Sequence, residues 1–218
     1  MLTIVIPVLN GAAELGACLA GLDGADEIII VDGGSTDDSV KIAHRAGTRV
    51  ISAPRGRGVQ LRKGGQAARG DWLLFLHADT RLGAGWRQAV AAHIATTPER
   101  AGYFDLHLDD PAWQARIIER GVALRVRWLG LPYGDQGLLI SRRLYDEVGG
   151  FRPLALMEDV DLARRIGGHR LRRLVATALT SAERWRRDGW VRRSARNLAC
   201  LALYAGGMAP ARLARFYR

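Results

Sequence analysis

Carboxylates, hydroxyls and a histidine follow three apolar runs of the sequence at the point where each run ends. These polar clusters are Pro7–Asn10, Asp32–Ser35 and His77–Thr80. Parallel strands bring their carboxyl ends to one edge of an α/β sheet, and ligands bind beyond that edge. A carboxylate there, such as Asp79, could hold Mg²⁺ or Mn²⁺ beside a substrate diphosphate. The cation would neutralise the charge that develops on a phosphate leaving group.

Each of these clusters also has a purely structural interpretation. Asp32-Gly33-Gly34-Ser35 is good turn chemistry followed by a helix cap, and Asp79 could cap the next helix. Three polar strand ends from separate parts of the sequence favour ligand binding over turn formation alone. We therefore expect Asp32 to face a ligand and Asp79 to lie at a phosphate-binding edge.

A fourth acidic cluster lies further along the chain, at 157–162. On a helix, residues at positions i, i+3, i+4 and i+7 share one face, and here they are Asp159, Leu162, Ala163 and Ile166. Asp159 would then sit at the mouth of an apolar stripe, where a carboxylate can serve as a general base. Glu158 is either a capping acid or a second site residue. Asp161 precedes Arg165 by four residues, which predicts a surface ion pair.

A polar loop, Tyr133–Gly137, enters a short predicted strand. Gly134 and Gly137 flank Asp135 and Gln136, and glycines let the backbone approach a ligand closely. Asp135 and Gln136 are therefore candidate binding residues, with a plain turn as the alternative.

Two periodicities of apolar residues predict the elements that position these clusters. Strands are expected at Leu2–Val8, Glu27–Val31, Arg49–Ser52, Trp72–Leu76, Tyr103–Leu108, Gly137–Ser141 and Arg170–Val175. Helices are expected at Glu14–Leu22, Ser35–Ala46, Gly85–Ala95, Ala112–Trp128, Arg142–Val148 and Glu158–Ile166, with loop and helix over Arg55–Gly70. Alternating strands and helices of this length indicate a single α/β domain with a mostly parallel, Rossmann-like sheet flanked by helices.

The charge of the chain is concentrated at its end. The formal net charge is +10, and residues 184–218 carry nine arginines and one acid, Asp188. This basic helical tail could attract phosphates or anionic lipid, or could be a solvated surface; we expect no nucleic acid partner. Cys18 and Cys200 lie in apolar stretches and are expected to be reduced in a cytoplasmic protein. No apolar run approaches the roughly 20 residues that span a bilayer.

Taken in order, these clusters resemble the family 2 glycosyltransferases, which have the GT-A fold. The resemblance covers about Leu2–Gly167, and is carried by IVIPVLN with Glu14, EIIIVDGGSTDDS, the RGRG segment, LLFLHADT and LMEDVDL. The compact form, with PRGRGVQL, HADT and YGDQG, is most similar to a bacterial subgroup sometimes connected with arsenosugar biosynthesis.

The resemblance implies roles for residues in each cluster. Residues 1–110 would bind a nucleoside-diphosphate sugar, and 111–183 would hold the acceptor and the catalytic base. The donor would contact Pro7, Asn10, Glu14, Asp32, Arg57 and Arg62. Asp79 matches the last acid of the family's metal motif, Asp159 matches its proposed base, and His77 stands where the family has the first metal-binding acid. Arg62 replaces an asparagine common in relatives.

These residues predict transfer of a sugar to an acceptor hydroxyl with inversion at the anomeric carbon. The acceptor would be a small molecule or a lipid-linked one, reached by peripheral membrane contact of the tail through aromatic and apolar residues: Trp185, Trp190, Leu198, Leu201, Leu203 and Tyr204. Packing of this tail onto the sheet is the alternative. The competing functions are sugar nucleotidyl transfer, which usually needs basic residues in an N-terminal glycine-rich stretch, and non-catalytic binding of nucleotides or nucleic acid.

Overall fold

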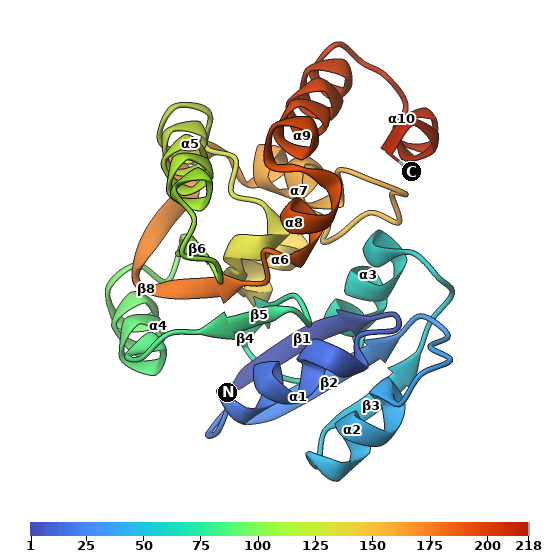
Figure 1. Cartoon of the computed structure of the whole chain (residues 1–218). Coiled ribbons are helices and arrows are strands. Elements are labelled where there is room, and N and C mark those ends of the chain that lie inside the picture. Colours follow the sequence, from blue (N-terminus) through green and yellow to red (C-terminus); the bar gives the residue numbers. More distant parts are fainter. Residues whose placement is uncertain (218) are drawn as a thin grey trace.

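A single eight-stranded sheet runs through the computed structural model, which describes residues 1–217 (Figure 1). Its strands are β1 (Leu2–Val8), β2 (Glu27–Asp32), β3 (Arg49–Ser52), β4 (Trp72–Phe75), β5 (Thr80–Leu82), β6 (Ala101–Leu108), β7 (Leu138–Ser141) and β8 (Leu171–Thr180). Their spatial order is β3-β2-β1-β4-β7-β6-β8-β5. The middle strands β1, β2 and β4 are rich in branched and aromatic side chains and are buried on both faces, which is typical of parallel strands covered by helices.

The strand directions gather residues from both halves of the chain at one edge of the sheet. β1 is parallel to β2 and β4, and β2 is parallel to β3. β7 is antiparallel to β4 and β6, whereas β6 and β8 are parallel. The carboxyl ends of β1, β2, β4, β6 and β8 therefore lie at the same edge as the amino end of β7. The polar residues that follow β4 consequently meet those that precede β7.

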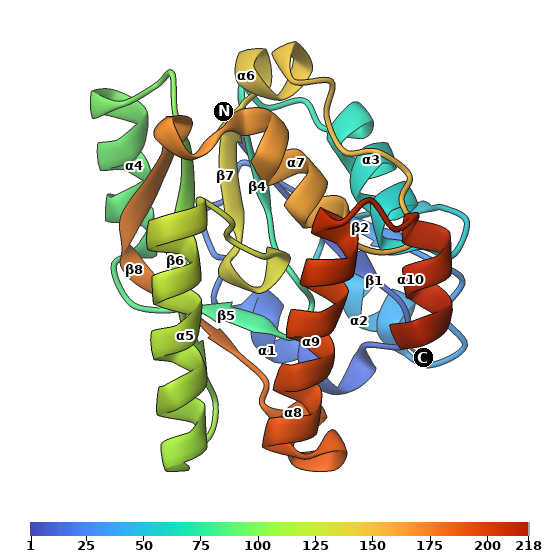
Figure 2. The ribbon, with the colours of Figure 1, turned by 90° about the horizontal axis from the view of Figure 1, so that it is seen from above.

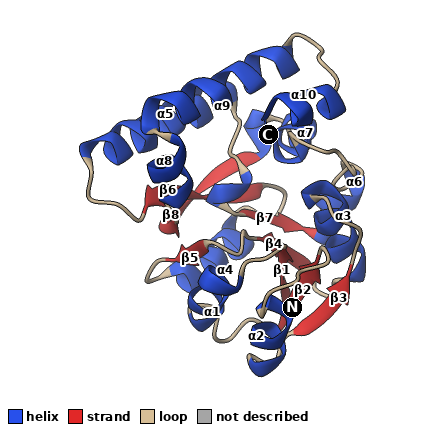
Figure 3. Ribbon diagram, turned by 45° about the vertical axis from the view of Figure 1, so that its right-hand side comes forward, coloured by secondary structure: helices blue, strands red, loops and turns tan. Residues whose placement is uncertain are grey.

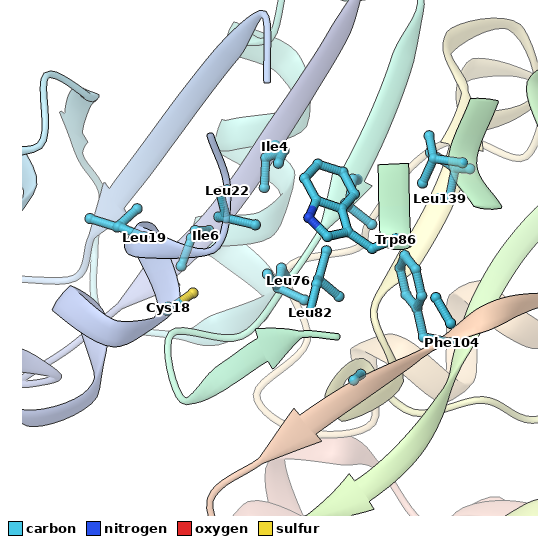
Figure 4. Close-up of a cluster of buried hydrophobic side chains, with 14 of the residues drawn as sticks. Ile4, Ile6, Cys18, Leu19, Leu22, Leu76, Leu82, Trp86, Phe104 and Leu139 are labelled. Atoms are coloured by element: carbon cyan, nitrogen blue, oxygen red, sulfur yellow. The ribbon is translucent and has the colours of Figure 1, made fainter. Parts of the chain in front are cut away.

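Helices cover both faces of the sheet (Figures 2 and 3). They are α1 (Ala12–Ala20), α2 (Ser39–Arg45), α3 (Arg57–Ala67), α4 (Trp86–Thr96), α5 (Trp113–Leu129), α6 (Arg142–Glu147), α7 (Glu158–Ile166), α8 (Glu183–Asp188), α9 (Trp190–Ala205) and α10 (Pro210–Tyr217), with 3-10 turns at Gly134–Gln136 and Gly168–Arg170. Buried residues of α1, α2 and α4 pack on one face (Figure 4). Those of α3, α6 and α7 pack on the other.

The alternation of side chains along β1 supplies both cores. Ile4, Ile6 and Val8 belong to the cluster under α1, α2 and α4. Val5 points to the opposite face and belongs to the cluster under α3, α6 and α7. Successive strand residues face opposite sides of a sheet, so an uninterrupted apolar run fits a strand buried on both faces. The prediction of an α/β domain with helices on both faces is confirmed.

Several predicted boundaries were wrong, and β5 was missed. β5 is three residues long, too short for an apolar pattern, and forms only because β8 pairs with it. The last strand was predicted to end at Val175 but extends to Thr180, since its second half pairs with both β5 and β6. Residues of the predicted loop and helix over Arg55–Gly70 form α3 from Arg57 onward.

The helix predicted to begin at Ser35 begins at Ser39 instead, because the intervening side chains bind the loop after β1. The Asp37 carboxylate accepts a hydrogen bond from the Ala12 amide (2.9 Å), and the Ser39 hydroxyl accepts one from the Gly11 amide (2.9 Å). Asp37 and Ser39 thus satisfy free amides at the start of α1, and Asp37 also accepts a hydrogen bond from the Ser39 backbone amide of α2 (3.0 Å). The two loops at the ends of β1 and β2 are held together by these bonds.

The C-terminal tail folds into α8, α9 and α10 and packs against the domain. Trp185 is buried with α5, and Cys200 and Leu213 are buried with Val160 of α7. Asp188 accepts hydrogen bonds from arginines of its own tail at 2.7–2.9 Å: Arg187, Arg193 and Arg196. Both cysteines are free and buried. Within residues 1–217, no helix has the length and apolar character needed to cross a membrane.

Helix α3 approaches β1 and β2 closely at Gly64, which predicts a sharp stability effect. A methyl group there would collide with Val5 and lie 2.8 Å from a methyl of Val31. We expect Gly64→Ala to lower the free energy of unfolding by about 1–3 kcal/mol, measured by urea denaturation, because the two elements must move apart.

Gly121, in the middle of α5, is the matched control because a methyl group would meet nothing within 4 Å. Gly121→Ala should raise the free energy of unfolding by up to about 1 kcal/mol, since alanine loses less chain entropy in a helix. Equal effects of the two substitutions would contradict the packing described for α3.

Candidate active site

Two adjoining openings lie at the sheet edge where the polar clusters meet. The first, the outer groove, spans about 1220 Å³, including space open to solvent, and runs along the end of β1, past Pro7, Asn10, Glu14 and Gln60. The second, the inner cavity, spans about 710 Å³, also including space open to solvent, and is lined by the carboxylates Asp79, Asp135 and Asp159. Both openings are lined by Arg57, His77, Asp79, Ser181 and Arg184. They therefore form one continuous site that joins at the end of β4.

His77 and Asp79 lie at this junction, directly after β4. A methyl group on Gly134 would collide with the His77 ring, so the close approach of the loop before β7 requires glycine. Burial, together with the charges of Arg57 and Arg184, lowers the pKa of His77 to about 3. The ring is therefore neutral at ordinary pH and has a lone pair available. The Asp79 carboxylate faces the Arg184 guanidinium at 3.9 Å.

Asp159 is the second residue of α7 and is oriented by the loop before β7. Its Oδ2 atom accepts a hydrogen bond from the Gly134 amide (3.0 Å), and its Oδ1 atom accepts one from the Val160 amide (2.8 Å). Met157, at the N-cap of α7, has a left-handed backbone (φ 64°) that sets where the helix begins. The positive end of the helix dipole stabilises a negative charge in the first turn. Asp159 is therefore a fixed carboxylate at the wall of the inner cavity.

Glu158 is buried beside Asp159 and is paired with Arg57 of α3. Its side chain is 1% exposed, and its Oε1 atom accepts a hydrogen bond from Arg57 Nε. Burial raises the pKa of Glu158, and the Arg57 guanidinium acts against that rise. Burial disfavours the charge of Arg57 as well, but Glu158 and Asp159 outweigh it and raise the Arg57 pKa. Glu158 thus holds Arg57 in the site, and the geometry favours Asp159 over Glu158 as the residue that meets substrate.

Asp161 is not the surface residue that its spacing from Arg165 predicted. The predicted ion pair forms (2.6 Å), but the Asp161 side chain is only 9% exposed and also pairs with Arg152 (3.1 Å). Arg165 also donates hydrogen bonds to backbone oxygens of Val148 and Gly150. The pair is buried because α7 packs against the loop that contains Val148 and Gly150. The ion pair therefore holds this loop against α7 and does not lie on a solvent-exposed face of the helix.

Asp135 is a third carboxylate of the inner cavity, and its environment disfavours its charge. Its Oδ1 atom is buried and has no hydrogen-bond partner among the described residues. Burial raises the pKa of Asp135 from 3.8 to about 6, and the nearby charges of Asp159 and Asp79 add to the effect. The Thr180 hydroxyl donates a hydrogen bond to the Asp135 carbonyl (3.1 Å), which holds the loop in place.

Gln136, the neighbour of Asp135, is turned away from both openings. It is 2% exposed, its amide nitrogen donates to the Phe104 carbonyl (3.1 Å), and its oxygen lies 3.4 Å from the Tyr133 amide. Gln136 therefore anchors the loop. Its predicted contact with ligand would require a different conformation.

The predicted donor-side residues divide into three groups by position. Those that line the outer groove are Pro7, Asn10, Glu14 and Arg57. Asp32, Gly33 and Ser35 lie behind the groove wall: the Asp32 carboxylate is 7% exposed and accepts hydrogen bonds from the amides of Gly34 (3.0 Å) and Ser35 (3.1 Å). The Ser35 hydroxyl accepts a hydrogen bond from the backbone amide of Asn10 (2.9 Å). Arg62 is exposed on α3 and lines neither opening.

Several residues of the site gave no usable signal in the sequence. Gln60 is 3% exposed and donates to the carbonyls of Val8 (2.8 Å) and Val31 (2.7 Å), which ties together the ends of β1 and β2. The tail contributes further lining residues to the inner cavity: Arg184, Trp185, Arg193, Asn197 and Tyr217. The sequence showed that the tail is rich in arginine, but the spacing of these arginines did not indicate which of them line the inner cavity.

The residues at the junction fit a cation that is held mainly by a diphosphate. Within residues 1–217, no group of three or more His, Cys, Asp or Glu side chains is placed to hold a metal ion by itself. The junction offers the Asp79 carboxylate and the neutral His77 ring. Mg²⁺ is commonly bound by one or two carboxylates, water and substrate phosphates. The donor set therefore suits a cation that arrives with its nucleotide.

The sequence matches the family described as Glycosyl transferase family 2 over residues 3–154. The chain belongs to this family. Membership confirms the predicted family and supports a transferase over the alternatives of a nucleotidyltransferase and of a non-catalytic binding protein.

Glycosyltransferases with similar sequences occur in mycobacteria. The chain is 42% identical over 93 residues to a PGL/p-HBAD biosynthesis glycosyltransferase of Mycobacterium bovis, covering 38% of this chain and 36% of that protein. It is 35% identical over 131 residues to an uncharacterized glycosyltransferase of Mycobacterium tuberculosis, covering 57% of this chain and 59% of that one. The chain thus matches about a third to three fifths of the length of these relatives.

Solved structures share the fold. One is Staphylococcus aureus TarS in complex with UDP-GlcNAc (TM-score 0.63, 16% identity, 82% of this chain and 58% of that chain). Another is glucosyl-3-phosphoglycerate synthase from Mycobacterium tuberculosis with Mg²⁺ and UDP (TM-score 0.60, 21% identity, 83% and 69%). At these identities the likeness establishes the fold alone, and the predicted GT-A architecture is confirmed.

The raised pKa of Asp135 predicts a pH-dependent gain in stability when its charge is removed. The folded chain holds this proton more tightly than the unfolded chain, so the carboxyl costs no stability below about pH 4 and destabilises the fold as pH rises through about 6. We expect Asp135→Asn to raise the Tm relative to wild type at about pH 8 and to change it little at about pH 4.

The matched control is Asp105→Asn on β6, whose carboxylate is paired with Arg173 at 2.6 Å. This control should not raise the Tm at about pH 8. A Tm difference between Asp135→Asn and wild type that is the same at both pH values would contradict the burial of the Asp135 charge.

Proposed function

We propose that this family 2 glycosyltransferase moves a sugar from a nucleoside-diphosphate donor, with UDP as the first candidate nucleotide, to the hydroxyl of an acceptor. The observation that carries the proposal is the junction of the two openings at His77, Asp79 and Arg57. A donor in the outer groove would place its diphosphate at this junction and its sugar toward the inner cavity. The solved complexes of TarS with UDP-GlcNAc and of the synthase with UDP support the choice of nucleotide by fold likeness.

The outer groove suits the nucleoside and the diphosphate. The loop after β1 supplies Asn10 and the first turn of α1 supplies Glu14, and Arg55 and Arg184 supply positive charge to the same groove. Arg184 is exposed and already faces Asp79, so it can move to a phosphate without leaving an unpaired buried charge. Fixed positive groups at a departing diphosphate lower the barrier to its departure.

The inner cavity suits the acceptor, with Asp159 as the base. In a single displacement, the acceptor oxygen forms a bond to the anomeric carbon while the bond from that carbon to the diphosphate oxygen breaks. Asp159 accepts the proton of the acceptor hydroxyl, and the configuration at the anomeric carbon inverts. The hydrogen bond from the Gly134 amide orients the carboxylate for this transfer. Asp135 lies in the same cavity and would orient acceptor hydroxyls through its unpartnered oxygen.

A divalent cation at Asp79 and His77 would stabilise the negative charge of the leaving nucleoside diphosphate. Structures of the synthase that contain Mn²⁺ or Mg²⁺ together with UDP support this assignment by fold likeness. Asp79 would hold the cation from the protein side, and His77 would remain neutral beside it because burial, together with the charges of Arg57 and Arg184, lowers its pKa.

The acceptor class, a small molecule or a lipid-linked one, belongs to this proposal. Most of the tail residues predicted to contact lipid pack on the domain instead, with Trp185 buried and Leu201, Leu203 and Tyr204 half-buried. Leu198 is 67% exposed. Of the tail residues predicted to contact lipid, it is the one that remains available for peripheral binding of the protein to the cytoplasmic side of a membrane. The connection with arsenosugar biosynthesis is carried by the sequence resemblance alone and stays a prediction.

Replacing Asp159 separates the proposed base from donor binding. We expect Asp159→Asn to lower the rate of UDP release from a UDP-sugar by about 10²–10⁴-fold, the range for loss of a general base. The affinity for UDP, measured by calorimetry, should stay within about twofold, because Asp159 faces the acceptor side. Asp146→Asn, exposed on α6, is the control and should change neither quantity. Loss of UDP affinity in Asp159→Asn would reassign the residue to donor binding.

Removing the metal should weaken nucleotide binding through Asp79. In calorimetry with Mn²⁺ present, we expect UDP to bind at least about tenfold more tightly than in the presence of a chelator, since the cation bridges carboxylate and diphosphate. Asp79→Asn should bind UDP weakly in both conditions and no longer respond to the chelator. Equal UDP affinity of the wild-type protein with Mn²⁺ and with chelator would exclude a metal-bridged diphosphate.

A further inference from the structure

Helix α5 exposes an apolar stripe along its whole length. The exposed side chains are Trp113 (68%), Ile117 (54%), Leu124 (51%) and Trp128 (77%). Spacings of four and seven residues put them on one face of the helix. The opposite face carries Ala115, Val122 and Val126, which are buried against β6 and α8. The helix is therefore satisfied on its inner side and unpartnered on its outer side.

The charges around this α5 face are positive and uncompensated. Arg120 and Arg127 are exposed and have no acidic partner among the described residues. The single acid of α5, Glu119, is 12% exposed and is occupied by Arg116 (2.8 Å) and by the Leu108 amide (2.7 Å). Helix α9 lies on the same side of the molecule, away from β1–β3, and contains no acidic residue (Figures 1 and 3).

From this face we infer that α5 is the membrane-binding surface of the protein and lies in the headgroup layer of an anionic bilayer. Trp side chains at both ends of an apolar stripe, with arginines beside them, match the interfacial layer, where aromatic rings and positive charges are favoured. A second copy of the chain fits the face poorly, because a symmetric contact of α5 with α5 would bring Arg120 and Arg127 near the same residues, with no exposed acid on α5 to face them.

The position of α5 connects this surface to the inner cavity. The helix ends at Leu129, and the Arg125 side chain donates a hydrogen bond to the Leu131 carbonyl (3.0 Å). The same guanidinium stacks on the ring of Tyr133 at 3.4 Å, and Tyr133 lines the inner cavity. A membrane-bound α5 would thus hold the acceptor side of the site near the lipid surface. This last step rests on the proposed function; the binding of α5 to membranes does not.

The test is co-sedimentation of the full chain with vesicles of phosphatidylcholine alone, and of phosphatidylcholine with about a third phosphatidylglycerol. We expect binding to the anionic vesicles and at least about tenfold weaker binding to the neutral ones. The double variants Ile117→Glu/Leu124→Glu and Trp113→Ser/Trp128→Ser should each lose at least about tenfold in affinity for anionic vesicles. These side chains are exposed, so the variants should keep the wild-type Tm.

Matched controls lie on other surfaces. Val175→Glu replaces a side chain that is 90% exposed on β8, and Arg45→Glu changes an exposed charge on α2, at the far side of the molecule (Figure 1). Both should bind vesicles like the wild type. Absence of binding to anionic vesicles, or equal binding by the α5 variants and wild type, would overturn the inference. Self-association in ultracentrifugation that the α5 variants abolish would overturn it too, by assigning the face to a second copy.

Measurements of UDP affinity distinguish failure of the membrane-binding inference from failure of the proposed transferase function. The α5 variants should bind UDP with wild-type affinity, because none of the substituted side chains lines either opening. Vesicle binding without any UDP binding would leave the membrane surface in place and contradict the transferase site instead.

Discussion

The ion pair between Arg57 and the buried Glu158 is the contact on which the arrangement of the site depends. Its partners are 101 residues apart in sequence and join the start of α3, which lines both openings, to α7, which lines the inner cavity. Glu158 is 1% exposed, so removing Arg57 would leave a buried carboxylate without its partner, which costs about 3–5 kcal/mol for a buried pair. Because Asp159 follows Glu158 directly, fixing this pair also fixes the carboxylate that we propose as the base. Arg57 is in turn held where both openings meet.

The sheet topology explains why residues so distant in sequence can cooperate. β7 runs antiparallel to β4, so the loop that precedes β7 meets the residues that follow β4. Gly134 lies against the His77 ring, and its backbone amide donates a hydrogen bond to Asp159. Gly134 thereby connects the residues that follow β4 to the start of α7. The arrangement sacrifices stability locally, since the charge of Asp135 is buried without a hydrogen-bond partner for one oxygen. Strain of this electrostatic kind is common where a site must present free polar atoms to a ligand.

The sequence allowed the α/β fold, the family and most site-bearing loops to be predicted, because apolar periodicity and strand-end polarity are local properties. It did not allow side-chain direction to be predicted. Asp32 and Gln136 have the residue types of ligand contacts, yet Asp32 binds amides of its own loop and Gln136 binds the Phe104 carbonyl of β6. The lining contributed by Arg184 and Tyr217 depends on how α8 and α10 pack on the domain, which no spacing within the tail encodes. Likewise, the tail's charge suggested lipid contact, whereas the exposed apolar stripe belongs to α5.

The most direct measurement is a crystal structure of the protein with a UDP-sugar and Mn²⁺. We expect the uridine along the loop after β1, the diphosphate between Asp79 and Arg184, and the sugar pointing into the inner cavity, with room for one acceptor hydroxyl between its anomeric carbon and Asp159. A nucleotide bound away from the junction of the two openings would contradict a shared donor and acceptor site. So would a sugar that turns its anomeric carbon away from Asp159.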